Sequence, residues 1–148
     1  MNTIDPQKAA RVWQRVQGNA QLSYRELTAM ISAAWTTGST YLKLSRQFSG
    51  SQSAAMRHLY EGQQAHVACL KGIYTLITGT RPAVRAMPLT SQDPEATLRQ
   101  CYGKTMQILA DYEKWSSDPE YGPVFARLAD REKDSCRTLL ELIGNLKK

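Results

Sequence analysis

The sequence predicts an all-α protein, in which two helical hairpins joined by a longer crossover form an antiparallel four-helix bundle behind a short N-terminal helix. Apolar residues recur every three or four positions along four long segments, which is the period of a helix with one buried face. Proline and glycine interrupt the pattern between these segments, and no segment alternates as a strand does. The 148 residues, of which 42% are hydrophobic and 22% charged, suit one domain over residues 1–148.

A short leading helix is predicted over residues 1–18. Asp5 followed by Pro6 is typical of a helix start, because aspartate caps free backbone amides and proline is tolerated in the first turn. Trp13 and its apolar neighbours follow at helical spacing, and Gly18 ends the segment. The segment lacks the apolar core of a secretory signal, so we expect no export.

The first hairpin is predicted over residues 22–79. Its first helix starts at Ser23, whose hydroxyl can accept a backbone amide while Glu26 reaches back, and it extends to about Phe48. Its second helix follows a break of three residues and ends at Gly79, because glycine can adopt the left-handed conformation that terminates helices. The short break requires the two helices to be antiparallel.

The crossover is predicted over residues 80–93, where the helical pattern lapses. Pro82 and Pro88 are too close together for a helix, and too few apolar residues alternate for a strand. We therefore expect an irregular connection between the two hairpins.

The second hairpin is predicted over residues 94–146. An Asp-Pro pair at residues 93–94 starts one helix, which extends to about Trp115. Another Asp-Pro pair at residues 118–119 starts the other helix, which ends near Gly144. The second hairpin therefore has the same organisation as the first.

Positions that step alternately three and four along each helix predict which side chains face the centre of the bundle. In the first hairpin these are Leu27, Ile31, Ala34, Gly38, Tyr41, Ser45 and Phe48, then Leu59, Gln63, His66, Leu70, Ile73 and Ile77. In the second hairpin they are Leu98, Cys101, Thr105, Ile108 and Tyr112, then Phe125, Leu128, Glu132, Ser135, Leu139 and Leu142. The two hairpins match at nearly constant intervals. An ancient duplication explains this match; the alternative is the spacing that any two amphipathic helices share.

Five polar residues fall on these otherwise apolar seams, near the middle of the bundle. They are Gln63, His66, Thr105, Glu132 and Ser135. Buried polar groups need partners to offset the loss of water. The sequence therefore predicts a polar layer across the core, flanked by Tyr41 and Tyr112.

Two hairpins with polar residues on facing seams resemble the ferritin-like superfamily, and small bacterial rubrerythrin-like proteins in particular, over approximately residues 22–146. The resemblance implies a di-metal site made from one glutamate on each of two helices and a Glu-x-x-His pair on each of the other two. Residues three apart share a helix face, so a carboxylate and an imidazole can bind one ion.

Most metal-binding positions that this resemblance implies are replaced. In chain order they are Ala34, Gln63, His66, Thr105, Glu132 and Ser135. The first and fourth stand at the two lone glutamates and cannot supply a carboxylate. Only His66 and Glu132 retain a ligand of the family. Two ligands on different helices would leave most of the coordination to water, so we do not expect a conventional di-iron centre.

Two interpretations of His66 and Glu132 remain open. In the first, they form a buried hydrogen-bonded pair, and Gln63, Ser135 and Thr105 satisfy the remaining groups. In the second, they bind metal in a reduced or rearranged iron or manganese site. Its further ligands would come from Glu26, Glu61, Asp130 or the cysteines.

The first interpretation predicts a non-enzymatic protein with a structural or interaction role and no cofactor. The second predicts a rubrerythrin-like iron or manganese protein that handles oxygen or peroxide. The chain contains no glycine-rich phosphate loop, nucleophile elbow or recognisable Ser, His and Asp set, so other enzyme classes lack support.

Charge and cysteine content indicate the kind of partner and compartment. The net charge is +6, but lysine and arginine are scattered singly, which disfavours nucleic-acid binding. Cys69, Cys101 and Cys136 are widely spaced, which favours reduced thiols and a cytoplasmic location. Cys69 lies one turn beyond His66, which leaves open a soft ion such as zinc. We expect no membrane segment. The expected partner is a second copy of the chain, which would form a homodimer through helix faces with Trp13 as a candidate contact.

Overall fold

The computed structural model describes residues 6–7, 22–87, 89 and 93–146. It contains four long helices, α2 (Tyr24–Ser45), α3 (Gly50–Thr78), α4 (Pro94–Trp115) and α5 (Gly122–Leu146), and the described residues include no strand. The prediction of an all-helical fold with four long helices is confirmed. The predicted leading helix over residues 1–18, with Trp13, lies outside the described residues except for Pro6 and Gln7.

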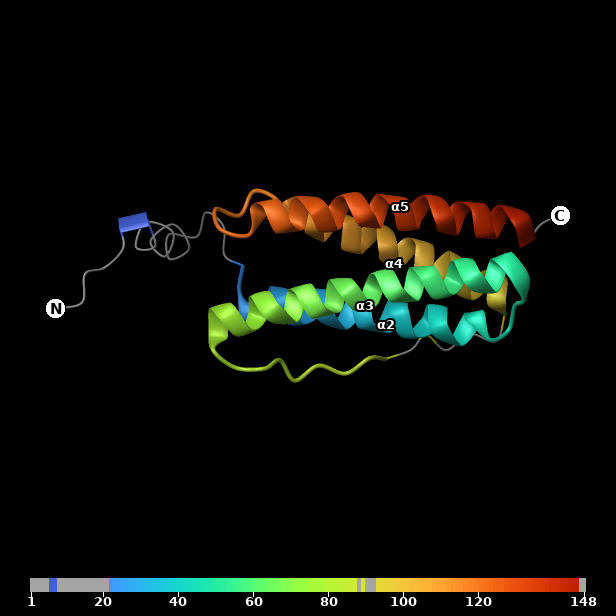
Figure 1. Ribbon diagram of the computed structural model, residues 1–148, viewed down its shortest axis with the longest axis horizontal. Helices are drawn as coiled ribbons and strands as arrows, with labels where there is room; N and C mark the ends of the chain where they lie inside the picture. The colour runs from blue at the N-terminus through green and yellow to red at the C-terminus, as the bar shows by residue number, and fades with distance from the viewer. Residues whose placement is uncertain (1–5, 8–21, 88, 90–92, 147–148) are drawn as a thin grey trace.

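The four helices lie side by side as a bundle (Figure 1). The chain passes along α2, turns back along α3, and crosses beside α2 to the far end, where α4 begins. Helices α2 and α3 form one closely packed pair and α4 and α5 the other, while α2 also contacts α4 and α3 also contacts α5. Each helix therefore has two neighbours around a common core.

Three helix ends form as the sequence predicts. The hydroxyl of Ser23 accepts the amide of Glu26 at 3.4 Å at the start of α2. The carboxylate of Asp93 accepts the amide of Glu95 at 3.2 Å at the start of α4, and Pro94 occupies the first helical position. Gly79 ends α3 with φ +75°, a backbone conformation that favours glycine.

Helix α5 begins three residues later than the Asp-Pro pair at residues 118–119 predicts, and it ends at Leu146 rather than near Gly144. One oxygen of Asp118 accepts the amides of Glu120 and Tyr121 at 3.1 and 2.8 Å, so this aspartate caps a separate turn before the helix. A Cβ at Gly122 would lie 2.4 Å from the carbonyl oxygen of Ser116, so the turn requires glycine there. Similarly, α2 ends at Ser45 rather than at about Phe48.

The crossover is attached to α2 by two hydroxyls. The amide of Met87 donates to Thr36 at 3.1 Å, and the amide of Leu89 donates to Thr40 at 3.3 Å. The two threonines lie one turn apart on the same face of α2, so they can pair with alternate residues of an extended chain. These contacts place the crossover along α2, as Figure 1 shows.

Two apolar clusters fill the core. One contains Leu27, Ile31, Leu70, Ile73, Ile108, Tyr112, Phe125 and Leu128, and the other contains Tyr41, Leu44, Met56, Leu59, Leu98, Cys101, Leu139 and Leu142. Nearly all the predicted seam residues are buried. The exceptions include Ile77, which is 38% exposed, and Ser135, which is only partly buried while Cys136 is buried beside it.

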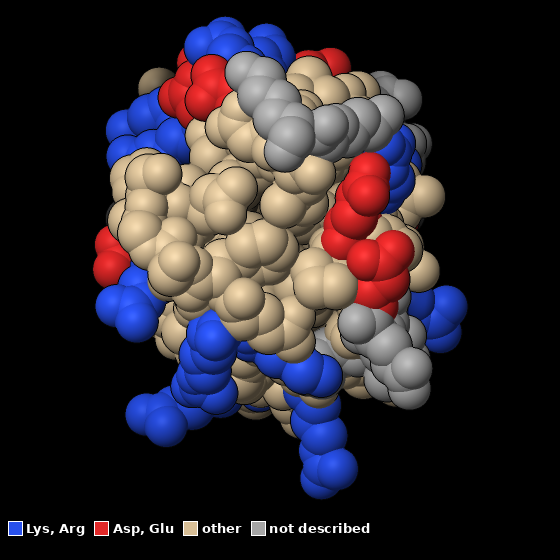
Figure 2. Space-filling view, turned by 90° about the vertical axis from the view of Figure 1, so that its right-hand side faces the viewer, with Lys and Arg blue, Asp and Glu red and all other residues tan. Residues whose placement is uncertain are grey.

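The surface gives two further observations. Figure 2 looks onto one end of the bundle, where lysine and arginine lie mainly around the rim and other residues form the centre. Within the part of the chain that the structure describes, no helix combines the length and apolarity needed to cross a bilayer.

Candidate functional site

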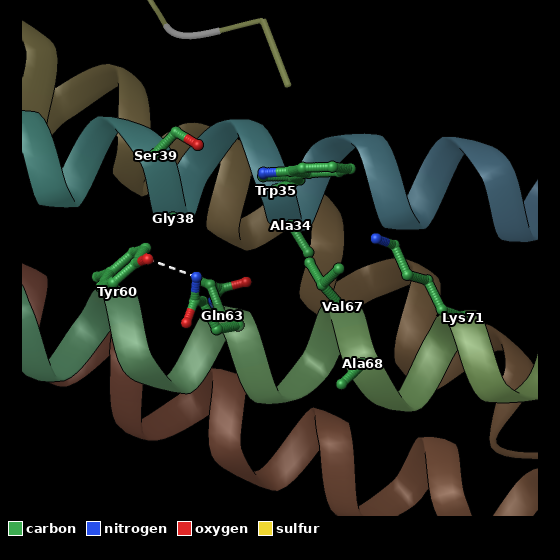
Figure 3. A pocket seen from close by; sticks show the side chains of 10 residues that line it. Ala34, Trp35, Gly38, Ser39, Tyr60, Gln63, Val67, Ala68 and Lys71 are labelled. Carbon is green, nitrogen blue, oxygen red and sulfur yellow. Dashed lines mark hydrogen bonds between the residues drawn. The ribbon is translucent and has the colours of Figure 1, made fainter. Parts of the chain in front are cut away.

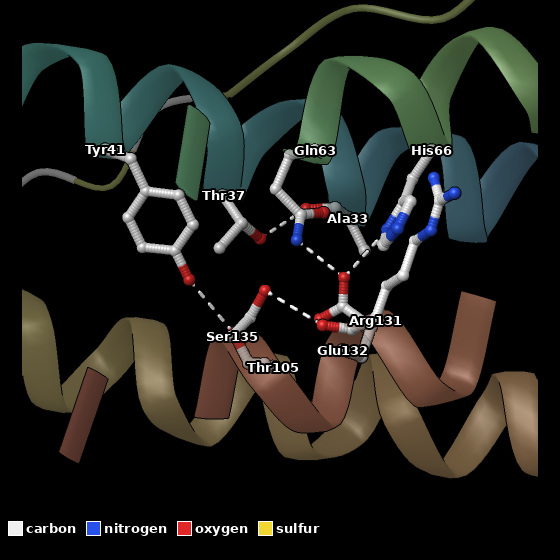
Figure 4. A network of polar contacts seen from close by, with 9 residues as sticks. All are labelled: Ala33, Thr37, Tyr41, Gln63, His66, Thr105, Arg131, Glu132 and Ser135. Carbon is white, nitrogen blue, oxygen red and sulfur yellow. Dashed lines mark hydrogen bonds and ion pairs between the residues drawn. The ribbon is translucent and has the colours of Figure 1, made fainter. Parts of the chain in front are cut away.

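The predicted polar layer lies between the two apolar clusters. Gln63 and His66 on α3, Thr105 on α4 and Glu132 on α5 are all buried, and Ala34 on α2 is buried beside them. Most of the layer that periodicity predicts is therefore confirmed, and its residues come from all four helices (Figure 4). Periodicity succeeds here because every helix is long enough to present one continuous face to the core.

Glu132 is the centre of this layer. Its Oε1 accepts a hydrogen bond from the amide Nε2 of Gln63 at 2.6 Å. Nδ1 of His66 lies 2.9 Å from the same oxygen as an ion-pair contact, although it is not aligned as a hydrogen bond. Gln63 and His66 are three residues apart on α3, so both reach one carboxylate across the core. His66 and Glu132 therefore lie together in the core, as predicted, but in an ion-pair contact rather than the predicted hydrogen bond, while Gln63 donates to Glu132 as expected.

The predicted role of Thr105 is wrong. Its hydroxyl pairs with the hydroxyl of Tyr41 at 3.0 Å rather than with His66 or Glu132. This contact joins α2 to α4 and satisfies a fully buried phenol. Burial raises the pKa of Tyr41 well above its ordinary value, with nearby Cys101 as a smaller cause, so this phenol stays neutral at physiological pH.

The predicted role of Ser135 is also wrong. Its hydroxyl donates to the backbone carbonyl of Arg131 on its own helix at 3.3 Å. The side chain that enters the core one turn after Glu132 is Cys136, whose Sγ lies 3.7 Å from the sulfur of Met106 on α4. The position that would hold the second histidine of a di-metal site is therefore turned out of the core.

Several polar atoms of the layer have no hydrogen-bond partner among the described protein atoms. They are Oε2 of Glu132, both ring nitrogens of His66, Oε1 of Gln63 and the hydroxyl of Tyr112. The ring of Tyr112 packs edge-on against His66, with ring centres 5.7 Å apart. Burial raises the pKa of Tyr112 well above its ordinary value, and the charge of Glu132 raises it further.

The layer offers a metal few ligands. Within the described residues, no group of three or more histidine, cysteine, aspartate or glutamate side chains is placed to bind an ion. Three further ligands considered from the sequence are exposed on the surface: Glu26, Glu61 and Asp130. Cys101 is buried, and burial raises the pKa of its thiol to about 12, which disfavours the thiolate that metals prefer.

A cavity of about 280 Å³ lies between α2 and α3 and reaches the layer at Gln63 (Figure 3). Ala34 and Gly38 leave room in its floor because they lack long side chains. At its rim, the ammonium of Lys71 lies 4.3 Å from the ring centre of Trp35. Ala34 is one of the six positions that the sequence resemblance would assign to a metal site, and here it lines a cavity instead.

A second cavity, of about 300 Å³, lies between α3 and α5 and reaches the layer at His66. Gly62 and Arg131 line it, together with Ser135 and Thr138. Sequence periodicity did not identify Gly62 or Arg131, because both are exposed and lie off the apolar seams. The sequence feature that could have identified them is that each directly precedes a buried polar residue of the layer.

The structure therefore contains one carboxylate shared by two side chains of α3, a separate Tyr41 to Thr105 bond, and two cavities that lead to the layer. This arrangement can hold a proton or a small polar ligand next to His66, but it holds few groups of the kind that bind metals. No protein-family model, curated protein or solved structure matches this chain.

Proposed function

We propose that this protein is a divergent member of the ferritin-like superfamily, with two antiparallel hairpins, that has lost the di-metal centre and has a structural or interaction role. Under this proposal it is not an oxidoreductase, and it needs no metal cofactor. The buried layer then serves to hold the four helices in one register.

The observation that carries this proposal is the double use of Oε1 of Glu132 by Gln63 and His66. An amide N–H that points at a carboxylate oxygen at 2.6 Å occupies the side from which a metal ion would approach. The family would place a glutamate at Gln63, where its charge would attract a cation. The amide instead donates to Oε1 of Glu132, so under this proposal the layer is a hydrogen-bonded substitute for the metal site.

Two features of the bundle support the ferritin-like arrangement. The crossover returns along α2, so that α4 begins at the end of the bundle where α2 finishes (Figure 1). Each helix of one pair also contacts a helix of the other pair. Both features belong to a bundle of two hairpins with one long connection.

A role in protein interaction is supported by exposed apolar side chains. Leu76 is 75% exposed and Met87 is 76% exposed, so both side chains are accessible to a second copy of the chain. Free thiols at three cysteines fit a reducing, cytoplasmic environment. Light scattering after size-exclusion chromatography tests the dimer, and a strict monomer at high concentration would exclude it.

A rubrerythrin-like iron or manganese protein is the second candidate. It is favoured by the free Oε2 of Glu132 and the free Nε2 of His66, which both lie in the buried layer. A metal bound there would use these two atoms and draw its other ligands from solvent.

Elemental analysis separates the two candidates. The untagged protein is purified after growth with added iron, manganese and zinc, alongside His66→Ala and Glu132→Ala variants. We expect far less than one metal ion per chain in all three proteins. About one or two ions per chain in the parent protein, with loss in both variants, would establish the metalloprotein and refute our proposal.

A further inference from the structure

A buried histidine lines the cavity between α3 and α5. The side chain of His66 is only 2% exposed, and its Nδ1 faces Glu132 at 2.9 Å. Its Nε2 has no partner among the described protein atoms, and His66 is one of the residues that line the cavity. A carboxylate beside one ring nitrogen orients the imidazole so that the other nitrogen meets a ligand.

A positive charge lies at the same cavity. Arg131 lines it from α5, and Figure 4 shows the ring of His66 between the carboxylate of Glu132 and the side chain of Arg131. Arg131 is exposed, so its guanidinium is available to a molecule that enters from solvent. Guanidinium groups bind carboxylates through two parallel hydrogen bonds.

The one acidic residue that lines this cavity does not cancel that charge. Asp134 is 71% exposed and pairs with Arg137 at 3.1 Å on the same helix. Its charge is therefore directed to another arginine and screened by solvent. Arg131 therefore supplies a positive charge at the cavity, and His58 also lines its wall.

We propose that the α3–α5 cavity binds a small carboxylate anion, through His66 at its inner end and Arg131 at its mouth. The volume of about 300 Å³ is at the lower limit for ligand pockets, so the anion must be small. Leu59 and Thr138 offer contacts for a short aliphatic part. In the complex, Nε2 of His66 contacts the carboxylate of the ligand while Nδ1 remains beside Glu132.

Nuclear magnetic resonance of the imidazole ring nitrogens tests this proposal directly, because the chain has only two histidines. The full-length, metal-free protein is titrated with acetate and butyrate at constant ionic strength, and inorganic phosphate serves as a comparison anion. A His58→Gln variant assigns the signals. We expect a saturable shift of the Nε2 signal of His66 with both carboxylates, and a weaker response to phosphate.

Two pairs of variants identify the site. Arg131→Ala should weaken carboxylate binding by about tenfold or more, because it removes a charge-assisted contact. Arg137→Ala is the matched control, since it removes an exposed arginine of the same helix that pairs with Asp134. It should leave the affinity nearly unchanged. Both residues are exposed, so neither variant should affect folding.

Filling the cavity gives the second pair. A Cβ at Gly62 or at Gly72 would meet nothing within 4 Å, so both glycines of α3 accept larger residues. Gly62→Leu projects into the wall of this cavity and should abolish binding, whereas Gly72→Leu lies outside it and should not. Leucine also favours a helix more than glycine does, so both variants should fold.

The outcomes are distinct. Saturable binding of carboxylates that is lost in Arg131→Ala and Gly62→Leu, but kept in both controls, would establish the site. The proposal is overturned if His66 shows no saturable shift, if phosphate alone binds, or if Arg131→Ala and Arg137→Ala respond alike.

Discussion

Helices α3 and α5 carry corresponding pairs of residues, Gln63 with His66 and Glu132 with Ser135, yet only the pair on α3 enters the core as a unit. Both α3 side chains are buried and reach the same carboxylate oxygen. On α5, Glu132 is buried, but Ser135 bonds to its own backbone. The two hairpins are therefore alike in sequence spacing and different in what they place at the centre.

The difference teaches that spacing alone does not decide which of two neighbouring positions faces a core. Positions three and four residues after a buried residue both lie near the same helix face. On α5, the position four residues after Glu132 is the buried one, where Cys136 contacts Met106 of α4. The packing of the neighbouring helix makes that choice.

Replacing Glu132 should cause the largest effect. Glu132→Ala removes the oxygen that Gln63 and His66 share, and it should destabilise the fold by about 3–5 kcal/mol because two buried polar side chains lose their partner. Urea unfolding followed by circular dichroism at neutral pH measures it. Glu141→Ala, an exposed glutamate of the same helix, is the control and should change little. Equal stability of the two variants would contradict the central role of Glu132.

Exchanging the amide of Gln63 on α3 with the carboxylate of Glu132 on α5 tests whether the two side chains interact. Gln63→Glu places a second carboxylate against Glu132 and should destabilise by about 2–4 kcal/mol. The double variant with Glu132→Gln restores one carboxylate and one amide at the same contact, so it should recover at least half of that loss. Chemical unfolding of the parent, both single variants and the double variant gives the coupling. Additive losses would mean that the two side chains do not interact.

High pH should weaken the layer through its two tyrosines. The pKa values of Tyr41 and Tyr112 are raised in the folded protein above 10.0, mainly by burial, so the folded state keeps protons that the unfolded state releases above that pH. Stability is therefore full below pH 10.0 and falls above it, by about 1.4 kcal/mol per pH unit for each buried tyrosine. Urea unfolding at a series of pH values above 10.0 measures this decrease, and the free energy of unfolding should fall less steeply with pH in Tyr41→Phe. Tyr24 is exposed, so Tyr24→Phe should keep the same decrease of the unfolding free energy with pH as the parent protein.

Replacing Ser135 should cause the smallest effect. Ser135→Ala removes a bond to the backbone of the same helix from a partly buried site, so the free energy of unfolding should change by about 0.5 kcal/mol or less. The measurement is the same urea titration used for Glu132→Ala. A loss comparable to that of Glu132→Ala would show that Ser135 takes part in the polar layer after all.

The helices and most of the layer could be predicted because they depend on local chemistry. Ser23, Gly79 and the Asp-Pro pair at residues 93–94 act on backbone groups within a few residues of themselves, and they mark helix ends in the structure. The burial of Gln63, His66 and Glu132 follows from the period of their helices. Even a local signal can mislead, since the Asp-Pro pair at residues 118–119 caps a turn rather than starting α5.

The sequence by itself determined the helical fold class, the main helix boundaries and the presence of polar groups in the core, because helical periodicity and capping depend only on residues close together in the chain. Only the tertiary structure decided that Thr105 pairs with Tyr41, that Cys136 replaces Ser135 in the core, and that a cavity leads to His66. These outcomes depend on how far apart the helices lie and how each is rotated, and many distant side chains set those quantities together.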